Sequence, residues 1–451
     1  MAIPPGSIRV DYDFSNPACY SGSGSTVFNL APFPLLKAST NGLFVSQGNS
    51  SYFSFSGDNV GGTNLESEFF NTISNTFTFN IWCQMQGTAV DKPIFHYAGP
   101  YGLNFRGNTG ATGTFNARMV GPGYGPSISS ASSNDTWFLF TIWCDATTFK
   151  LYRNGVLVSS GAFTGSLPSG SSKFYLGGIG LQNNAKCKVA RFQYYTAALD
   201  DADILQYYND TKLYFPLNRY DFSETQSYPG TGNTVFDMAG SLNLLIGGAS
   251  TPAYVGAGTS SYFEFSNGYI FNSGVTGLGS TFTISTWSMV APGYTFDGTV
   301  FAAGKQITAE NPQINYNYTV DNAINFNFLN TTSITTPFIG DQWQNITVTA
   351  DGTNSKLYVD GSFVTSTSQA GSAWTSGGFV LGKGVDSDGN PQGNSYEGKI
   401  ALLRVYNSSI GSTDVLALYN LDTSRFPLPP PPPAYAGSVG GRQFAQGFNS
   451  A

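Results

Sequence analysis

The sequence repeats itself once along its 451 residues, and this duplication limits the fold more than any other feature. Seven short segments of the first half recur in the second half in the same order, displaced by 205 to 211 positions. Tyr12-Asp13-Phe14 returns as Tyr220-Asp221-Phe222, for example. Two copies at this spacing predict two domains of roughly 200 residues, each large enough to bury a core. We therefore predict domains at residues 1–213 and 214–424, followed by a tail at 425–451.

The repeated segments have the alternation that is typical of β-strands. FTFNIW at 77–82 and FTISTW at 282–287 alternate large apolar with small or polar side chains, which gives each strand one buried face. Two repeated segments end in Asn154-Gly155 and Asp360-Gly361, dipeptides preferred in tight hairpin turns because both positions need a positive φ. Each copy closes with apolar residues at helical spacing, near 200–208 and 412–419. We expect an all-β fold of antiparallel sheets with one short helix in each domain.

The composition excludes several classes of function. Charged residues make up only 10% of the chain and aromatic residues 15%, which argues against disorder. The net charge is −7 and the cations are scattered, so we expect no nucleic-acid partner and no electrostatic binding to membranes. No apolar run approaches 18 residues, and no secretory signal is visible at the start. We therefore expect a chain made in the cytoplasm without membrane insertion.

The closing segment of the second copy carries a family resemblance. YEGKIALLRVYN at 396–407, with the tryptophans of FTFNIW and FTISTW and the two KLYxxG hairpins, resembles the LamG-like branch of the concanavalin A-like lectin/glucanase superfamily. The resemblance implies two tandem jelly-roll-like antiparallel β-sandwiches. This fold serves lectins, adhesion modules, glycosidases and capsid components, so the resemblance alone does not select a function.

The sequence offers little for catalysis. His96 is the single histidine, which leaves a catalytic triad without support and excludes histidine-based metal sites. Glycosidases of this superfamily carry an E-x-D-x-x-E strand, and this motif is absent. Glu66 and Glu68 share a strand-like spacing, but we expect them in a loop, and the second copy has no equivalents. We expect a protein that is not an enzyme.

All four cysteines lie in the first copy, so disulfides are not the shared framework of the two domains. No C-x-x-C spacing indicates zinc. We expect small buried thiols at Cys19, Cys83, Cys144 and Cys187.

Two kinds of ligand site can be proposed from side-chain chemistry. Aromatic rings in loops could stack on sugar rings, and the candidates are Tyr101, Tyr124, Tyr294 and Trp374. The alternative is that these rings pack at the domain rims or contact a neighbouring protein.

The second kind is a calcium site at 386–397. Oxygen ligands at Asp386, Asp388, Asn390 and Glu397 have the spacing of a twelve-residue calcium loop. Pro391 replaces the glycine that such a loop requires, however, and no helices flank it. The alternative is an acidic surface hairpin, and we expect no other cofactor.

The tail has a composition unlike that of the domains. RFPLPPPPP at 425–433 predicts a polyproline II segment. With no catalytic set, we favour a structural or adhesive protein of an assembled particle: a minor capsid or surface protein of a large virus or phage, located in the virion. Its partners would be other particle proteins, contacted through the domain surfaces and residues 425–451. The alternative is a free lectin-like protein that binds glycans.

Overall fold

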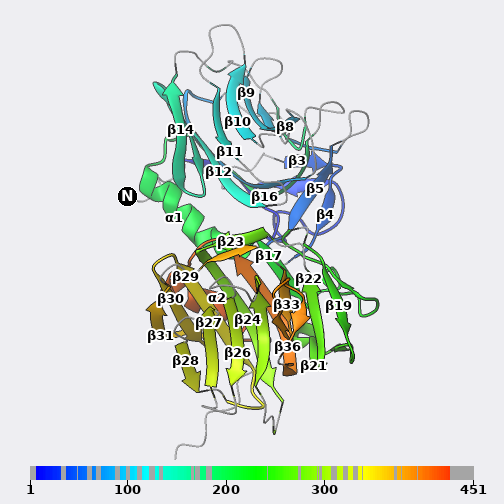
Figure 1. The fold of residues 1–451 in the computed structure, drawn as a ribbon. Helices are drawn as coiled ribbons and strands as arrows, with labels where there is room; N and C mark the ends of the chain where they lie inside the picture. Colours follow the sequence, from blue (N-terminus) through cyan, green and yellow to red (C-terminus); the bar gives the residue numbers. More distant parts are fainter. Residues whose placement is uncertain are drawn as a thin grey trace, which may run out of the picture.

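The alternating segments of both copies form antiparallel strands, and the computed structural model places them in two lobes, coloured blue to green and green to red in Figure 1. The expected all-β fold with two tandem sandwiches is confirmed. The polyproline segment from residue 427 onward lies outside the described residues. The structure describes residues 7–31, 37–47, 49–57, 63–67, 73–86, 92–97, 102–108, 114–120, 127–131, 136–163, 167, 173–178, 185–240, 242–272, 276–291, 293, 297–305, 312–317, 323–328, 334–337, 339–369, 373–376, 378–393 and 395–426.

The described part of the first lobe contains two eight-stranded sheets. One sheet has the order β14 (Val156–Ala162), β13 (Thr148–Arg153), β12 (Trp137–Asp145), β7 (Thr76–Met85), β16 (Lys186–Tyr195), β5 (Tyr52–Ser56) and β4 (Leu43–Val45), with β1 (Ile8–Asp13) also paired to β16. The other has the order β11 (Ile128–Ala131), β10 (Thr114–Val120), β9 (Gly102–Asn108), β8 (Lys92–Tyr97), β15 (Phe174–Leu176), β6 (Leu65–Ser67), β3 (Lys37–Thr40) and β2 (Thr26–Phe28).

The second lobe repeats this topology. One sheet has the order β20 (Ala253–Val255), β21 (Tyr262–Ser266), β36 (Glu397–Tyr406), β24 (Thr281–Val290), β29 (Gln344–Asp351), β30 (Asn354–Val359) and β31 (Ser362–Ser368), with β17 (Asn218–Asp221) on β36. The other has the order β18 (Thr234–Val235), β19 (Leu244–Gly248), β22 (Gly268–Asn272), β33 (Phe379–Leu381), β25 (Gly298–Ala303), β26 (Pro312–Asn317), β27 (Ala323–Phe328) and β28 (Ile334–Pro337). Two small ladders join β23 (Thr276–Gly279) to β32 (Trp374–Ser376) and β34 (Gly384–Val385) to β35 (Pro391–Gln392).

Each lobe has a core between its two sheets. In the first, Phe79 of β7 meets Phe95 of β8 with ring centroids 4.8 Å apart. In the second, Ile284 of β24 and Phe301 of β25 belong to one fully buried cluster. The central strands of both sheets therefore bury at least one face between the sheets, as expected for a sandwich, whereas the edge strands β14 and β31 have no buried residue.

The predicted hairpin turns and closing helices are present. Asn154 and Gly155 have φ of 54° and 78°, and Asp360 and Gly361 have φ of 50° and 74°. The helices are α1 (Asp201–Thr211), capped by the carboxylate of Asp200, and α2 (Ser412–Asp422), and short 3-10 turns lie at η1 (Lys212–Tyr214) and η2 (Gly258–Ser260). Within the described residues, neither helix is long and apolar enough to span a membrane.

Each copy also ends on the same aromatic contact. Phe215, which follows α1 and η1, stacks on Trp82 with ring centroids 4.3 Å apart. Phe426, which follows α2, stacks on Trp287 at 4.6 Å. After Phe215 the chain enters β17 and the second lobe directly, and α1 lies at the boundary between the lobes in Figure 1. The repeat thus includes the segment that leads out of each domain.

Candidate functional site

A row of amide side chains covers the outer face of the second lobe's β25–β28 sheet. The strands PQINYN (β26) and AINFNF (β27) alternate strictly, so Ile314 and Phe326 enter the core while their amide neighbours face outward. Pairing in register sets Gln313 opposite Asn327 and Asn315 opposite Asn325. We call this set, together with Thr299 opposite Asn315 on β25, the amide face.

The amide face has unused hydrogen-bonding capacity. Asn325 is only 7% exposed, yet its Oδ1 has no hydrogen-bond partner among the described residues. The Oδ1 of Asn315 is buried and unpartnered in the same way, while its Nδ2 donates to Gln313 Oε1 at 3.3 Å. A buried amide oxygen without a donor costs about 1–3 kcal/mol, so a donor supplied by a ligand would offset this cost at both oxygens.

These side chains line a hollow of about 140 Å³, and the lining is almost entirely polar and uncharged. Asp297 is the one carboxylate among the described lining residues. A hollow of this size and chemistry suits a neutral ligand rich in hydroxyl groups, each of which can donate to one amide oxygen and accept from another amide.

The signal for this site was present in the sequence as the period-2 spacing of Gln and Asn in β26 and β27. This spacing also fits an ordinary half-buried strand, and only aromatic rings were taken as markers of a sugar site, so the amides were not predicted as a site. Of the four aromatic candidates, Tyr101, Tyr124 and Tyr294 lie outside the described residues. Tyr294 is three positions before Asp297, which lines the hollow.

The prediction of Trp374, the fourth aromatic candidate, as a loop ring that stacks on sugars is wrong. It is 1% exposed and packs edge-on against Phe282, Phe301 and Phe379. Its ring is therefore part of the core and does not present a face to a sugar. A tryptophan between Ser and Gly residues resembles a loop ring in sequence, but the short strand β32 carries it inward.

The predicted calcium loop has the hairpin form that we gave as the alternative. Asp386 turns its carboxylate onto the hairpin's own backbone, accepting the N–H groups of Asn390 and Asp388 at 2.8 Å each. The Asn390 N–H is the main cause of a pKa of Asp386 below the ordinary value. Glu397 instead begins β36, opposite Ser266, while Asp388 and Asn390 are exposed. Within the described ranges, no group of three or more His, Cys, Asp or Glu side chains is placed to hold a metal ion.

The corresponding face of the first lobe has a different chemistry. Register places Arg106 opposite Asn116 and Arg118 opposite Asn104, where the second lobe has the four amides. His96 lies on the same sheet, with Nδ1 2.5 Å from Asn104 Oδ1. The two copies thus share a scaffold but not a binding surface.

The expectation that Glu66 lies in a loop is also wrong. It lies in strand β6 rather than in a loop, and it forms an ion pair with Lys173. Glu68 is outside the described residues.

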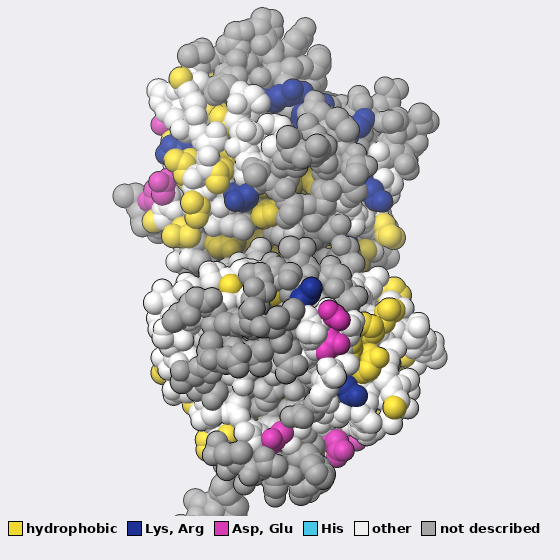
Figure 2. Space-filling view, viewed as in Figure 1, with side chains coloured by type: hydrophobic (Ala, Val, Ile, Leu, Met, Phe, Trp, Pro, Cys, Tyr) yellow, Lys and Arg dark blue, Asp and Glu magenta, His cyan; other side chains and the backbone are white. Residues whose placement is uncertain are grey.

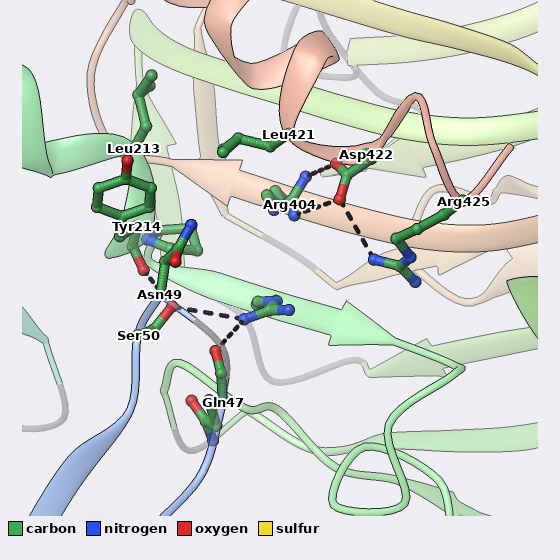
Figure 3. A pocket seen from close by; sticks show the side chains of 11 residues that line it. Gln47, Asn49, Ser50, Leu213, Tyr214, Arg404, Leu421, Asp422 and Arg425 are labelled. Atoms are coloured by element: carbon green, nitrogen blue, oxygen red, sulfur yellow. Dashed lines mark hydrogen bonds and ion pairs between the residues drawn. The ribbon is translucent and has the colours of Figure 1, made fainter. Parts of the chain in front are cut away.

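A second hollow, of about 200 Å³, lies between the lobes (Figure 3). The first lobe contributes Gln47, Asn49 and Ser50, and the second contributes a network of arginines and aspartates. In Figure 3, Arg404 is joined to Asp422, and Asp422 to Arg425, on the side of the hollow opposite Gln47. Figure 2 shows few charged side chains over the described part of the face drawn there. Charged residues make up only 10% of the chain, so this network is a local concentration of charge.

Comparison with known proteins gives a family for the chain. A laminin G family model, described as concanavalin A-like lectin/glucanases superfamily, matches residues 39–205 and 230–416. No curated protein matches the chain significantly in sequence.

Several solved structures are similar in fold. Domain 4 of the arabinanase AbnA from Geobacillus stearothermophilus, in complex with arabinotriose, is 15% identical, with 44% of this chain and 97% of that chain covered and a TM-score of 0.33. The CBM40 of a Ruminococcus gnavus sialidase, bound to sialyllactose, is 12% identical, with 33% and 97% covered and a TM-score of 0.26. The binding domain of botulinum neurotoxin DC, in complex with rat synaptotagmin II, is 10% identical, with 92% and 97% covered and a TM-score of 0.42. These likenesses are to the fold and say nothing of what this chain binds.

Proposed function

Since the chain belongs to the concanavalin A-like lectin/glucanases superfamily in both of its domains, we propose that it is a non-enzymatic carbohydrate-binding protein whose site is the amide face of the second domain. The observation that carries this proposal is the buried, unpartnered amide oxygen of Asn325. A sugar hydroxyl would supply the missing donor.

The chemistry of the hollow favours binding over hydrolysis. Glycoside hydrolysis generally uses two carboxyl groups roughly 5–10 Å apart. Of the described residues that line the hollow, only Asp297 has a carboxyl group, and the other polar side chains are amides or hydroxyls. The amides can hold a sugar in one orientation but cannot transfer protons at neutral pH.

Glycan-array screening of the purified chain, followed by titration calorimetry on the best glycan, tests this proposal. Asn325→Ala should weaken binding at least tenfold, because it removes the central hydrogen-bonding group. Asn116→Ala, at the equivalent position of the first domain, is the matched control and should leave the affinity unchanged. An array without hits, or equal affinity of the Asn325→Ala and wild-type chains, would contradict the proposal.

A second candidate function is membership of an assembled particle, such as a virion, in which another protein covers the second domain. The observation that favours it is a surface present in both copies but covered in only one. In the first domain, Tyr52, Trp137 and Lys188 are 6%, 5% and 8% exposed. The second domain lies over this surface: Arg219 donates to the backbone oxygen of Gln47 at 3.2 Å, and Gln84 donates to the backbone oxygen of Ala239 at 2.8 Å.

The equivalent residues of the second domain, Tyr262, Trp343 and Lys399, are all partly exposed. Their local geometry is the same, since Lys188 lies over the Tyr52 ring at 4.9 Å and Lys399 over the Tyr262 ring at 5.1 Å. A surface that is built to be covered in one copy is a natural contact for a further particle protein in the other.

Lysine footprinting tests this second function. If the chain is a particle component, Lys399 should react with an acylating reagent in the purified chain and be protected in intact particles, while Lys188 stays protected in both. Absence of the chain from purified particles by mass spectrometry, or equal labelling of Lys399 in both samples, would refute it.

A further inference from the structure

We propose that the hollow between the two domains is a binding site for a small oxyanion, namely the carboxylate, sulfate or phosphate group of an acidic ligand. This site is separate from the amide face and does not depend on carbohydrate binding there. Arg219, Arg404, Arg425 and Asp422 line it. Asp221, behind this lining, pairs with both Arg219 and Arg425, so the three arginines share two carboxylates and one positive charge has no carboxylate of its own.

Arg404 and Arg425 bind both oxygens of the two carboxylates, those of Asp422 and Asp221. Arg404 binds both oxygens of Asp422, with a distance of 3.1 Å from Nη2 to Oδ1. Arg425 binds both oxygens of Asp221, at 2.7 and 2.9 Å, and also reaches Asp422 at 3.2 Å. These bidentate contacts are the strong form of arginine–carboxylate pairing, so neither aspartate is available to neutralise a third cation fully.

Arg219 is that third cation. Its Nη2 shares the Asp221 carboxylate at 3.1 Å, but its Nη1 donates only to neutral groups: the backbone oxygen of Gln47 at 3.2 Å and Ser50 Oγ at 3.4 Å. Its Nε is buried and has no partner among the described residues. Asp237 accepts the backbone N–H of Arg219, but no ion pair joins it to the guanidinium within the described part of the chain.

The surroundings of Arg219 complete an oxyanion site. Its side chain is only 11% exposed, and a guanidinium removed from water requires anionic or hydrogen-bonding partners. Gln47 and Asn49 of the first domain also line the hollow, and the exposed amide of Asn49 can donate to the same ligand (Figure 3). A bound oxyanion would therefore contact both domains, and we expect it to stabilise the junction between them.

Titration calorimetry and thermal unfolding of the full chain test the proposal, at constant ionic strength with chloride as the balancing anion so that general screening is held fixed. The probes are inorganic phosphate, sulfate and glucuronate, with glucose as the neutral comparison. At least one oxyanion should bind and raise the melting temperature, and glucose should do neither at this hollow. The oxyanion that binds identifies the source of the group.

Three variants make the result specific. Arg219→Gln should weaken oxyanion binding at least tenfold, and Asn49→Asp, on an exposed side chain that can be changed without loss of folding, should weaken it by like-charge repulsion. Arg153→Gln, on β13 of the first domain, is the matched control and should have no effect. No binding of any oxyanion to the wild-type chain, or unchanged binding in Asn49→Asp and in folded Arg219→Gln, would overturn the proposal.

Discussion

Arg404 and Asp422 form a buried ion pair in the second domain. Replacing both by the residues at the equivalent positions of the first domain should show that their contributions to stability are strongly coupled. Arg404 is 6% exposed and Asp422 3% exposed. In the aligned repeat, Gln193 and Thr211 occupy these positions in the first domain, which folds without an ion pair there. Arg404→Gln alone leaves the buried carboxylate of Asp422 with only its 3.2 Å contact to Arg425, and Asp422→Thr alone leaves the buried guanidinium of Arg404 without its carboxylate. Each single variant should lose about 3–5 kcal/mol of unfolding free energy.

The double variant should lose much less than the sum of the two. It removes both charges together, and the hydroxyl introduced by Asp422→Thr would stand where the Thr211 hydroxyl stands in the first domain. There, Thr211 Oγ1 accepts a hydrogen bond from Trp82 Nε1 at 2.9 Å. The equivalent Trp287 Nε1 is buried without a partner among the described residues, so a hydroxyl acceptor should add about 1 kcal/mol. We expect a coupling energy of at least about 2 kcal/mol between the two positions.

Urea unfolding of the full chain, followed by tryptophan fluorescence, measures these differences. Each domain contains three tryptophans, and the transition of the unchanged first domain serves as an internal reference. A double variant whose loss equals the sum of the single losses within about 0.5 kcal/mol would refute this reasoning, because it would mean that the pair is not coupled.

Other outcomes follow from the same structure. Phe426→Ala removes a fully buried ring that stacks on Trp287 and should destabilise the second domain by about 3–5 kcal/mol in the same unfolding assay, whereas an unchanged transition would show that the contact is dispensable. Burial alone would raise the pKa of Asp221, but Arg219 and Arg425 outweigh it and lower the pKa below the ordinary value. The stabilisation from this carboxylate should thus be complete above about pH 4 and decline as the pH falls further, and Asp221→Asn should flatten this part of the stability–pH curve; an unaltered slope would contradict the assignment. Burial raises the pKa of Cys144 to about 11 and that of Cys83 well above its usual range. We therefore expect a thiol reagent at pH 8 to label neither cysteine in the folded chain and both in denaturant. Rapid labelling of the folded chain would show that these thiols are accessible.

The fold could be predicted from the sequence because the duplication supplied the same information twice. The hairpins at 154–155 and 360–361 needed only the local rule that both turn residues take a positive φ, and both were correct. The closing helices were likewise set by local spacing. The pairing of strands that are far apart in the sequence could be predicted only through the family resemblance, since local patterns do not specify which strands become neighbours in a sheet.

The sites were harder to predict, for physical reasons that differ between them. The burial of Trp374 depends on the strand that carries it inward, which its neighbours in sequence do not reveal. The amide face depends on the register that sets Asn315 opposite Asn325, a contact between two strands. Arg219 and Arg425 both line the hollow between the domains, although they are distant in sequence, and they meet there because both bind the carboxylate of Asp221 on β17.

Binding of carbohydrate to the amide face of the second domain can be observed residue by residue. The most direct measurement is an NMR titration of the ¹⁵N-labelled chain with the best glycan from the array, following the side-chain amide signals of asparagine. Carbohydrate binding at the amide face should give saturable shifts of the Asn315 and Asn325 signals, with those of Asn104 and Asn116 in the first domain unmoved. Binding that shifts only the first-domain signals, or saturation by the glycan with the Asn315 and Asn325 signals unchanged, would contradict it.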